Sequence, residues 1–355
     1  MANVIRVTHG SRPAYSFRPA AFPDHPGCYL MKDENDRVIY VGKANSLRHR
    51  VASYFRESEA PHRKTEMIDR IRDIEVVLVR NDREALVLES NLIRHHNPPF
   101  NSRFTRDDDS YYYIAITDEL FPRVVPYRKR RANFAVTGPA GVRALFGPYV
   151  GWRLRNRLLD AVRSAFPLRT CHSLPERACL RRAGGACTAP CAGETSVDAY
   201  DRIVASARRF LARPPRSFLC EIERQMEEAS TLLDFERAST LRDRLAALEH
   251  AALPQAVERH RPRDLDVLYV EGGRLLALRV CDGAVVEISG PHVVGDSAGA
   301  VDRWIGDAPR LIVHGKIDWS VLRKHRSVQV SMPGRSYAGQ LLELCRINLA
   351  YRMSG

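Results

Sequence analysis

The side chains best suited to chemistry lie between residues 27 and 55, where tyrosines alternate with basic residues. Residues 27–31 and 38–42 are rich in β-formers, and the polar stretch between them predicts a hairpin with a loop longer than the tightest type. Residues 44–56 carry apolar side chains four positions apart, which predicts a helix. Where the strands meet this helix, we expect groups that can transfer protons and bind anions to converge. They are Tyr29, Tyr40, Lys43, Arg50 and Tyr54.

A glutamate on a second expected helix is a candidate metal ligand. This helix spans about residues 82–95, with Asp82 as a plausible N-cap, and Glu89 falls inside its apolar stripe. Burying a carboxylate without a partner is costly, so Glu89 requires a cation, a metal or an edge position open to water. Prolines then end the helix shortly before Asn101.

These residues resemble the GIY-YIG nuclease family, and in particular the amino-terminal domain of UvrC excinucleases. The resemblance extends over about residues 22–250. The second, RNase H-like nuclease and the helix-hairpin-helix modules of UvrC are not recognisable, so the chain looks like the short, Cho-like homologues. Cys28 departs from the aliphatic residue usual in the family, and we expect it to pack within its strand. The matching residues are Gly27-Cys-Tyr29, Tyr40-Val-Gly42-Lys43, Arg50, Tyr54, Glu89 and Asn101.

The resemblance implies a metal-dependent DNA endonuclease. Glu89 would hold Mg²⁺ or Mn²⁺, with water completing the coordination shell. Either Tyr29 or Tyr40 would accept a proton from the attacking water, with Lys43 or the metal easing loss of the tyrosine proton. Which of the two tyrosines is the base stays open.

The resemblance also assigns residues to the substrate. Arg50 would hold the scissile phosphate, Tyr54 would orient it, and Asn101 would brace the site. Gly42, Lys43 and Arg50 would contact DNA.

Composition agrees with a nucleic-acid partner. Lys and Arg total 55 against 42 Asp and Glu, a net charge of +13, which favours a polyanion as the partner. A hydrophobic share of 45% is enough for packed cores. No stretch is long enough to span a membrane and no signal-peptide pattern opens the chain, so we expect a cytoplasmic protein.

Four of the eight cysteines fall within 21 residues, spaced C-x7-C-x7-C-x3-C. They are Cys171, Cys179, Cys187 and Cys191. In a reducing compartment such a group favours a metal site over disulfides. The resemblance implies a [4Fe-4S] cluster, with zinc or four unliganded thiols as alternatives and His172 as a bystander.

The predicted fold class is α+β, in five segments. These are a leader (1–21), a GIY-YIG nuclease domain (22–103), a linker region with the cysteine cluster (104–200), a UVR-like helical hairpin (201–252) and a small α+β domain of unknown role (253–355).

The linker region has aromatic strands followed by a basic helix beginning near Trp152. The helix carries Arg153, Arg155, Arg157 and Arg163. The aromatics predict strand packing or, alternatively, a surface that lies along DNA, and the arginines suit phosphate contact.

Residues 214–250 predict two helices that break at Leu233-Asp234-Phe235, with Asp234 as N-cap. The second helix resembles the UVR motif by which UvrC contacts UvrB, with Phe235 as the expected anchor. The alternative is a plain hairpin that packs on its own body.

Residues 264–355 predict a three-strand meander, a strand at 311–313 and helices near 298–305 and 337–351. Their carboxylates, such as Asp264 and Asp266, fall mainly at strand starts and turns, where solvated acids are common. There is room for little more than a meander and two helices, so we expect no second nuclease centre. The resemblance implies that this single centre makes one incision, 3′ to a lesion, with UvrB and indirectly UvrA. The alternatives are a non-catalytic adaptor and a lesion-independent, structure-specific nuclease.

Overall fold

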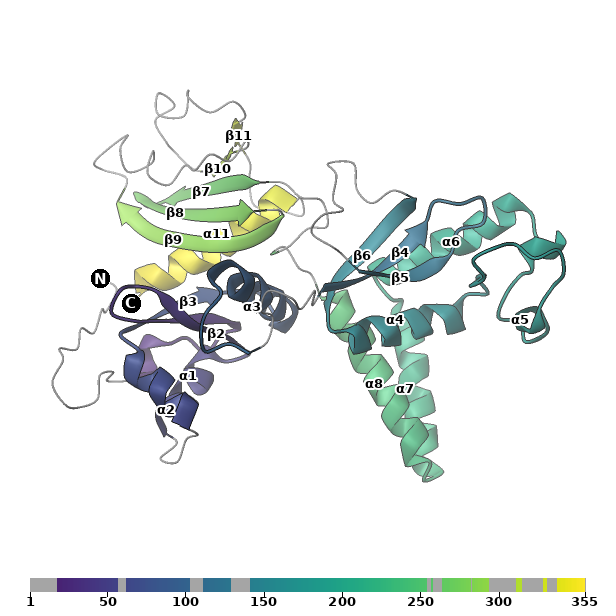
Figure 1. Cartoon of the computed structure of the whole chain (residues 1–355), viewed down its shortest axis with the longest axis horizontal. Helices are drawn as coiled ribbons and strands as arrows, with labels where there is room; N and C mark the ends of the chain where they lie inside the picture. The colour runs from purple at the N-terminus through teal and green to yellow at the C-terminus, as the bar shows by residue number, and fades with distance from the viewer. Residues whose placement is uncertain are drawn as a thin grey trace. The chain divides into compact units, whose positions relative to one another are not determined.

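The computed structural model describes residues 18–56, 62–102, 111–128, 141–253, 257, 264–281, 283–293, 311–314, 328–330 and 337–354. The fold is mixed α+β, as predicted. The chain divides into two compact units (Figure 1). The first joins Met1–Asp108 to Pro254–Gly355, and the second is Asp109–Leu253. None of the described helices is long and apolar enough to cross a membrane.

The first unit contains a three-stranded antiparallel sheet with β1 in the centre. Its elements, in chain order, are η1 (Pro19–Ala21), β1 (Gly27–Lys32), β2 (Val38–Ala44), α1 (Leu47–Arg56), α2 (His62–Arg70), β3 (Asp73–Leu78) and α3 (Asp82–His96). The strand order is β2-β1-β3. The expected hairpin, helix and second helix are therefore present. The N-cap of α3 was predicted wrongly, because Asn81 rather than Asp82 accepts the Glu84 N–H.

Each edge strand of this sheet is hydrogen-bonded by an asparagine side chain. On β2, the Val41 N–H donates to Asn101 Oδ1 at 2.9 Å, and Asn101 Nδ2 donates to the Val41 carbonyl at 2.8 Å. On β3, the Leu78 N–H and carbonyl bond the amide of Asn348, both at 2.9 Å. A side-chain amide supplies one acceptor and two donors, so it can replace a neighbouring strand locally.

Asn348 belongs to the C-terminal part of the same unit. Its elements are β7 (Leu265–Glu271), β8 (Arg274–Cys281), β9 (Ala284–Val293), β10 (Leu311–His314), β11 (Val328–Val330) and α11 (Tyr337–Ser354). The strands form one sheet in the order β11-β10-β7-β8-β9. The predicted meander is β7 to β9, and β10 and β11 extend it in parallel.

The expectation of room for little more than a meander was therefore wrong. Strand β10 was expected, but its parallel pairing with β7 was not, because such a pairing joins residues far apart in sequence. The helix expected near residues 298–305 lies outside the described residues.

Helix α11 packs against both β3 and the C-terminal sheet (Figure 1). Ile347 and Tyr351 pack on the core of the β2-β1-β3 sheet. Arg352 donates to Glu75 Oε1 at 3.0 Å and to the carbonyl of Ile288 at 3.4 Å. The C-terminal segment thus forms part of the body that supports this sheet.

The second unit places helices around another three-stranded sheet, in the order β5-β4-β6. Its elements are β4 (Tyr111–Thr117), β5 (Val124–Arg128), β6 (Val142–Val150), α4 (Trp152–Ala165), α5 (Leu180–Ala183), η3 (Pro190–Ala192), α6 (Val197–Ala212), α7 (Arg216–Thr231) and α8 (Phe235–Ala252). The two-helix prediction is confirmed, and Asp234 caps α8 by accepting the Arg237 N–H.

The hairpin of α7 and α8 is buried against its own unit at the base and exposed to solvent at the tip. Ile222 and Leu248 lie in the same apolar core as the sheet and α4. At the tip, Leu232, Leu233 and Phe235 are 69%, 71% and 65% exposed. The packing alternative therefore describes the base of the hairpin only.

We predict that Asn348→Ala lowers the free energy of unfolding by about 1–3 kcal/mol, because it leaves the buried N–H and carbonyl of Leu78 without partners. Denaturant unfolding measures the change. Met353→Ala, on an exposed part of the same helix, is the control. A loss no greater than that of the control would contradict the role of Asn348 at the edge of β3.

Candidate active site

Three tyrosines from separate elements meet at their hydroxyls. Tyr29 on β1 lies 2.8 Å, oxygen to oxygen, from Tyr54 on α1, and the Tyr54 hydroxyl donates to that of Tyr40 on β2 at 3.2 Å. The ring centroids are 5.9–6.2 Å apart. The structure therefore brings together the tyrosines expected from the sequence, as a continuous chain of phenol groups.

Burial disfavours the phenolate forms of Tyr29 and Tyr40. Burial, followed by the neighbouring Tyr54, raises the pKa of Tyr29 well above its ordinary value. The same two causes raise the pKa of Tyr40. Positive charge from Arg50 acts in the opposite direction on both groups. Either tyrosine could act as a base only with added positive charge close to it.

Gly42 makes room for this arrangement. It lies opposite Tyr29 in the register of β1 and β2. A Cβ atom at Gly42 would lie 2.2 Å from the Tyr29 hydroxyl oxygen, far inside contact distance. Any larger side chain at residue 42 must displace Tyr29 or the strand.

Glu89 faces the same groove from α3. Its Oε1 accepts the backbone N–H of Lys43 at 3.0 Å, a partner that the sequence did not indicate. The fully buried carboxylate of α3 is Glu84, which is paired with Arg80. Glu89 is partly exposed instead and lines a groove of about 900 Å³.

The donor set fits a hard cation held largely by water. Among the residues that the structure describes, no group of three or more His, Cys, Asp or Glu side chains is placed to hold a metal. The groove offers Glu89 as a carboxylate ligand, and Mg²⁺ commonly keeps several waters while binding one or two carboxylates.

The expected basic residues also lie at the groove. The Arg50 guanidinium lies 5.3 Å from the Tyr54 ring centre. The Lys43 ammonium forms an ion pair with Asp82. The sequence did not indicate Asp82 as a partner of Lys43. His49, Ser46 and Ser53 line the groove and were also missed. Their residue types and spacing in the sequence do not distinguish them from ordinary solvent-exposed residues.

Asn101 also lines the groove, and its side-chain amide bonds the backbone of Val41 on β2. Cys28 is fully buried and its thiol donates to the Ala85 carbonyl, as expected for strand packing. The site residues predicted in the first unit thus lie together on β1, β2, α1 and α3, with Asn101 beside them.

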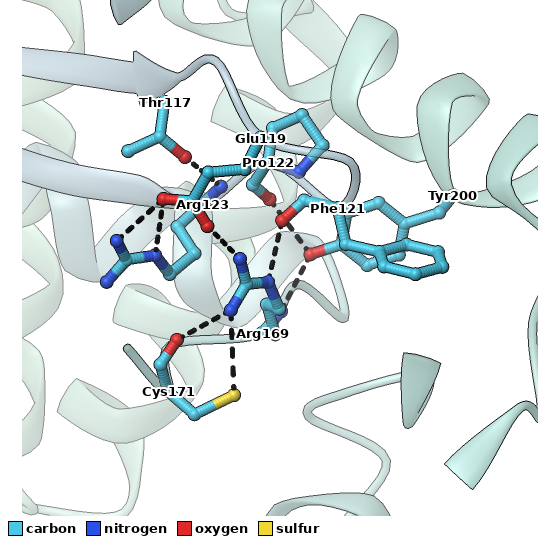
Figure 2. A network of polar contacts seen from close by, with 8 residues as sticks. All are labelled: Thr117, Glu119, Phe121, Pro122, Arg123, Arg169, Cys171 and Tyr200. Atoms are coloured by element: carbon cyan, nitrogen blue, oxygen red, sulfur yellow. Dashed lines mark hydrogen bonds and ion pairs between the residues drawn. The ribbon is translucent and has the colours of Figure 1, made fainter. Parts of the chain in front are cut away.

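The cysteine segment belongs to the second unit and is held by a buried arginine (Figure 2). Arg169 is 3% exposed and donates to the carbonyls of Phe121 at 2.6 Å and Cys171 at 2.8 Å. It also pairs with Glu119. Tyr200 accepts the Arg169 backbone N–H at 3.0 Å. This network fixes the chain at Cys171, and nothing in the local sequence of Arg169 indicated it.

All eight cysteines are free. Burial raises the pKa of the Cys187 thiol, and the nearby thiols of Cys171, Cys179 and Cys191 raise it further, against a backbone hydrogen bond that lowers it. The four are neighbours, but they do not form a ligand set in the described structure.

Three family models match the chain. They are the UvrC-like GIY-YIG domain over residues 25–102, the UvrC/Cho excinuclease middle domain over 111–210 and the UvrB/uvrC motif over 217–251.

Curated relatives are UvrABC system C proteins. That of Methanospirillum hungatei is 36% identical over 246 residues, covering 69% of this chain and 46% of the relative. That of Moorella thermoacetica is 40% identical over 254 residues, covering 70% and 40%. The chain thus spans less than half the length of these relatives.

A solved structure is also similar in sequence. The GIY-YIG N-terminal endonuclease domain of UvrC from Thermotoga maritima, described as bound to its catalytic divalent cation, magnesium, is 34% identical. The match covers 22% of this chain and 86% of that domain, with a TM-score of 0.21.

We predict that Gly42→Ala destabilises the protein by about 1–3 kcal/mol, because the new methyl group overlaps the Tyr29 hydroxyl. Thermal unfolding measures the change. The matched control is Gly184→Ala, since a Cβ there would meet its nearest atom at 3.8 Å. Equal stability of the two variants would refute the close packing of Tyr29 on Gly42.

Proposed function

This chain belongs to the UvrC family, and on that premise we propose that it is a metal-dependent DNA endonuclease of nucleotide excision repair. The observation that carries the proposal is the joint position of the tyrosine hydroxyl chain, Glu89 and Arg50 in one groove. We place the activity in the cytoplasm, where thiols stay reduced.

In the proposed reaction, Arg50 holds the scissile phosphate, because a guanidinium binds phosphate oxygens in a bidentate fashion. Tyr40 is the better candidate for the base, since it is partly exposed while Tyr29 is fully buried. Tyr54 joins the two phenols and orients them. The Lys43 N–H holds the carboxylate of Glu89 toward the groove.

A Mg²⁺ or Mn²⁺ ion at Glu89 would supply the positive charge that the high pKa values of the tyrosines require and would polarise the phosphate. Asn101 would brace β2 next to Tyr40 through its bonds to Val41.

We predict that Glu89→Gln lowers DNA cleavage more than ~100-fold, because the neutral amide binds a divalent cation poorly. DNA binding should persist, since Arg50 and Lys43 are unchanged. Cleavage of a lesion-bearing duplex with Mg²⁺ and UvrB measures the effect. The control is Glu66→Gln, on an exposed helical pair with Arg70. Activity of Glu89→Gln within about tenfold of the wild type would refute the assignment of Glu89.

We propose that the tip of the α7–α8 hairpin binds UvrB, and through it acts with UvrA. The motif match and the three exposed apolar side chains at the tip support this partner. The exposed Leu232 and Leu233 extend the surface that the sequence attributed to Phe235 alone.

We predict that Phe235→Ala weakens the UvrB complex by more than ~1 kcal/mol, since large apolar anchors dominate small interfaces. Calorimetric titration measures the affinity, and unchanged thermal unfolding checks that the hairpin still folds. Glu249→Ala, at the other end of α8, is the control. An unchanged affinity for Phe235→Ala would mean that the tip does not contact UvrB.

We further propose that Cys171, Cys179, Cys187 and Cys191 hold a [4Fe-4S] cluster. Thiolates are suitable ligands for such a cluster. The other three thiols are close enough to Cys187 to raise its pKa electrostatically. Arg169 would position Cys171 through its bond to the Cys171 carbonyl.

We predict that anaerobically purified protein is brown and contains iron and sulfide, both lost when the four cysteines are replaced by serine. Cys220→Ser, an exposed cysteine outside the group, is the control. If the protein contains one zinc per chain, the four cysteines form a zinc site and the cluster assignment is wrong. Folded protein without metal would refute both the cluster and the zinc site.

We propose a single incision, 3′ to the lesion. The C-terminal sheet has five strands, so its size does not exclude a second nuclease centre. The argument against such a centre rests on the carboxylates of the sheet. Asp266 is 2% exposed and pairs with Arg279 at 3.2 Å, which also pairs with Glu287 at 3.2 Å. Carboxylates held by a shared arginine are poorly available to a metal.

A further inference from the structure

An aromatic and basic surface on the second unit has no part in the nuclease groove. Tyr112 lies on β4, opposite Arg128 of β5 and Tyr149 of β6. Tyr149 is buried in the core, whereas Tyr112, near the start of its strand, is partly exposed. Helix α4 packs against all three strands (Figure 1). It starts two residues after β6 ends, so its first turn lies near Tyr112.

Arginines flank both aromatic side chains at this position. The guanidinium carbons of Arg155 and Arg128 lie 5.1 Å and 5.8 Å from the ring centre of Tyr112. Arg153 lies 5.5 Å from the ring centre of Trp152. Trp152 and Arg155 are three residues apart on a helix, so they share one side of it.

Helix stability does not explain these arginines. The positive end of the helix dipole lies at the N-terminus, where cations are unfavourable. Helix α4 nevertheless has no acidic residue in its first turn and no side-chain cap. Of its early arginines, Arg157 pairs with Asp243. Arg153 and Arg155 make no salt bridge with any residue that the structure describes.

The exposure of Trp152 is also unexplained by packing. Leu158, Leu159 and Val162 of the same helix are buried, but Trp152 is 52% exposed. Arg155 Nε donates to Asn156 Oδ1 at 2.9 Å, but neither Arg153 nor Arg155 pairs with a carboxylate of a described residue. An exposed indole beside such guanidinium groups combines a stacking surface with phosphate-binding charge, the two features that bind single-stranded nucleic acid.

We propose that the surface formed by Tyr112, Trp152, Arg153 and Arg155 binds single-stranded DNA, with bases stacked on the aromatic rings and phosphates on the arginines. Single strands are favoured because the ring faces need unpaired bases. The surface lies outside the groove of Glu89, and its binding does not depend on cleavage.

The test measures binding of a fluorescently labelled oligothymidylate to the full chain in EDTA, by anisotropy. Trp152→Ala and Arg155→Gln should each weaken binding about tenfold, because loss of one stacked base or one phosphate contact has an effect of that order. Binding should also quench tryptophan fluorescence in the wild type, and Trp152→Ala should abolish that quenching. Because EDTA prevents metal-dependent cleavage, the assay reports binding alone, and its result does not depend on whether the groove of Glu89 cuts DNA.

Two exposed residues of the same unit provide the controls. Leu120→Ala removes an exposed apolar side chain, and Arg208→Gln removes a charge from α6. Arg155→Lys keeps the charge without the planar group and should lie between the wild type and Arg155→Gln. Thermal unfolding of every variant shows whether the fold is retained.

The proposal is overturned if Trp152→Ala and Arg155→Gln bind within twofold of the controls. It is also overturned if the oligonucleotide leaves tryptophan fluorescence unchanged, or if duplex of the same length binds equally well through the same residues. The last result would indicate phosphate contact without stacking.

Discussion

The candidate site depends on the register between β1 and β2. That register sets Tyr29 opposite Gly42, the one residue type that leaves room for the Tyr29 hydroxyl. A shift of one residue would turn Tyr29 to the other face of the sheet and break its contact with Tyr54. Residues on both faces of β1 are buried, which already favours one register. Here Asn101 and Asn348 bond one residue on each edge strand, which adds a fixed point on both sides of β1.

Electrostatics then follows from burial. Burial raises the pKa of Tyr29 and of Tyr40, so it disfavours the phenolate form of both groups. Glu89 provides negative charge at the same groove and satisfies one oxygen with a backbone N–H. In the proposed reaction, a divalent cation at Glu89 would supply the positive charge that loss of a proton from Tyr29 or Tyr40 requires.

Local patterns predicted much of the nuclease sheet and of its site. The hairpin, α1 and α3 follow from strand alternation and helical spacing, so the tyrosines, Arg50 and Glu89 could be placed from the sequence. The pattern placed Glu89 in the apolar stripe, although the carboxylate that is fully buried is Glu84. Propensity could not separate Asn81 from Asp82 as a cap, because both side chains cap helices well.

Contacts between distant residues could not be predicted. Asn348 reaches Leu78 from 270 positions away, and Arg169 reaches Glu119 from 50. The parallel pairing of β10 with β7 likewise leaves no periodic signal in either strand. Such contacts depend on how elements pack, and a single sequence records only the local preference of each element.

The most direct test of the proposed activity is a map of the cuts made on a duplex with one defined adduct. The duplex is labelled at each end in turn and incubated with UvrA, UvrB, Mg²⁺ and this protein. We expect one cut, on the 3′ side of the adduct, which requires UvrB. A second cut on the 5′ side that survives Glu89→Gln but disappears with Asp264→Asn would contradict the single nuclease centre. The absence of any cut would contradict the endonuclease itself.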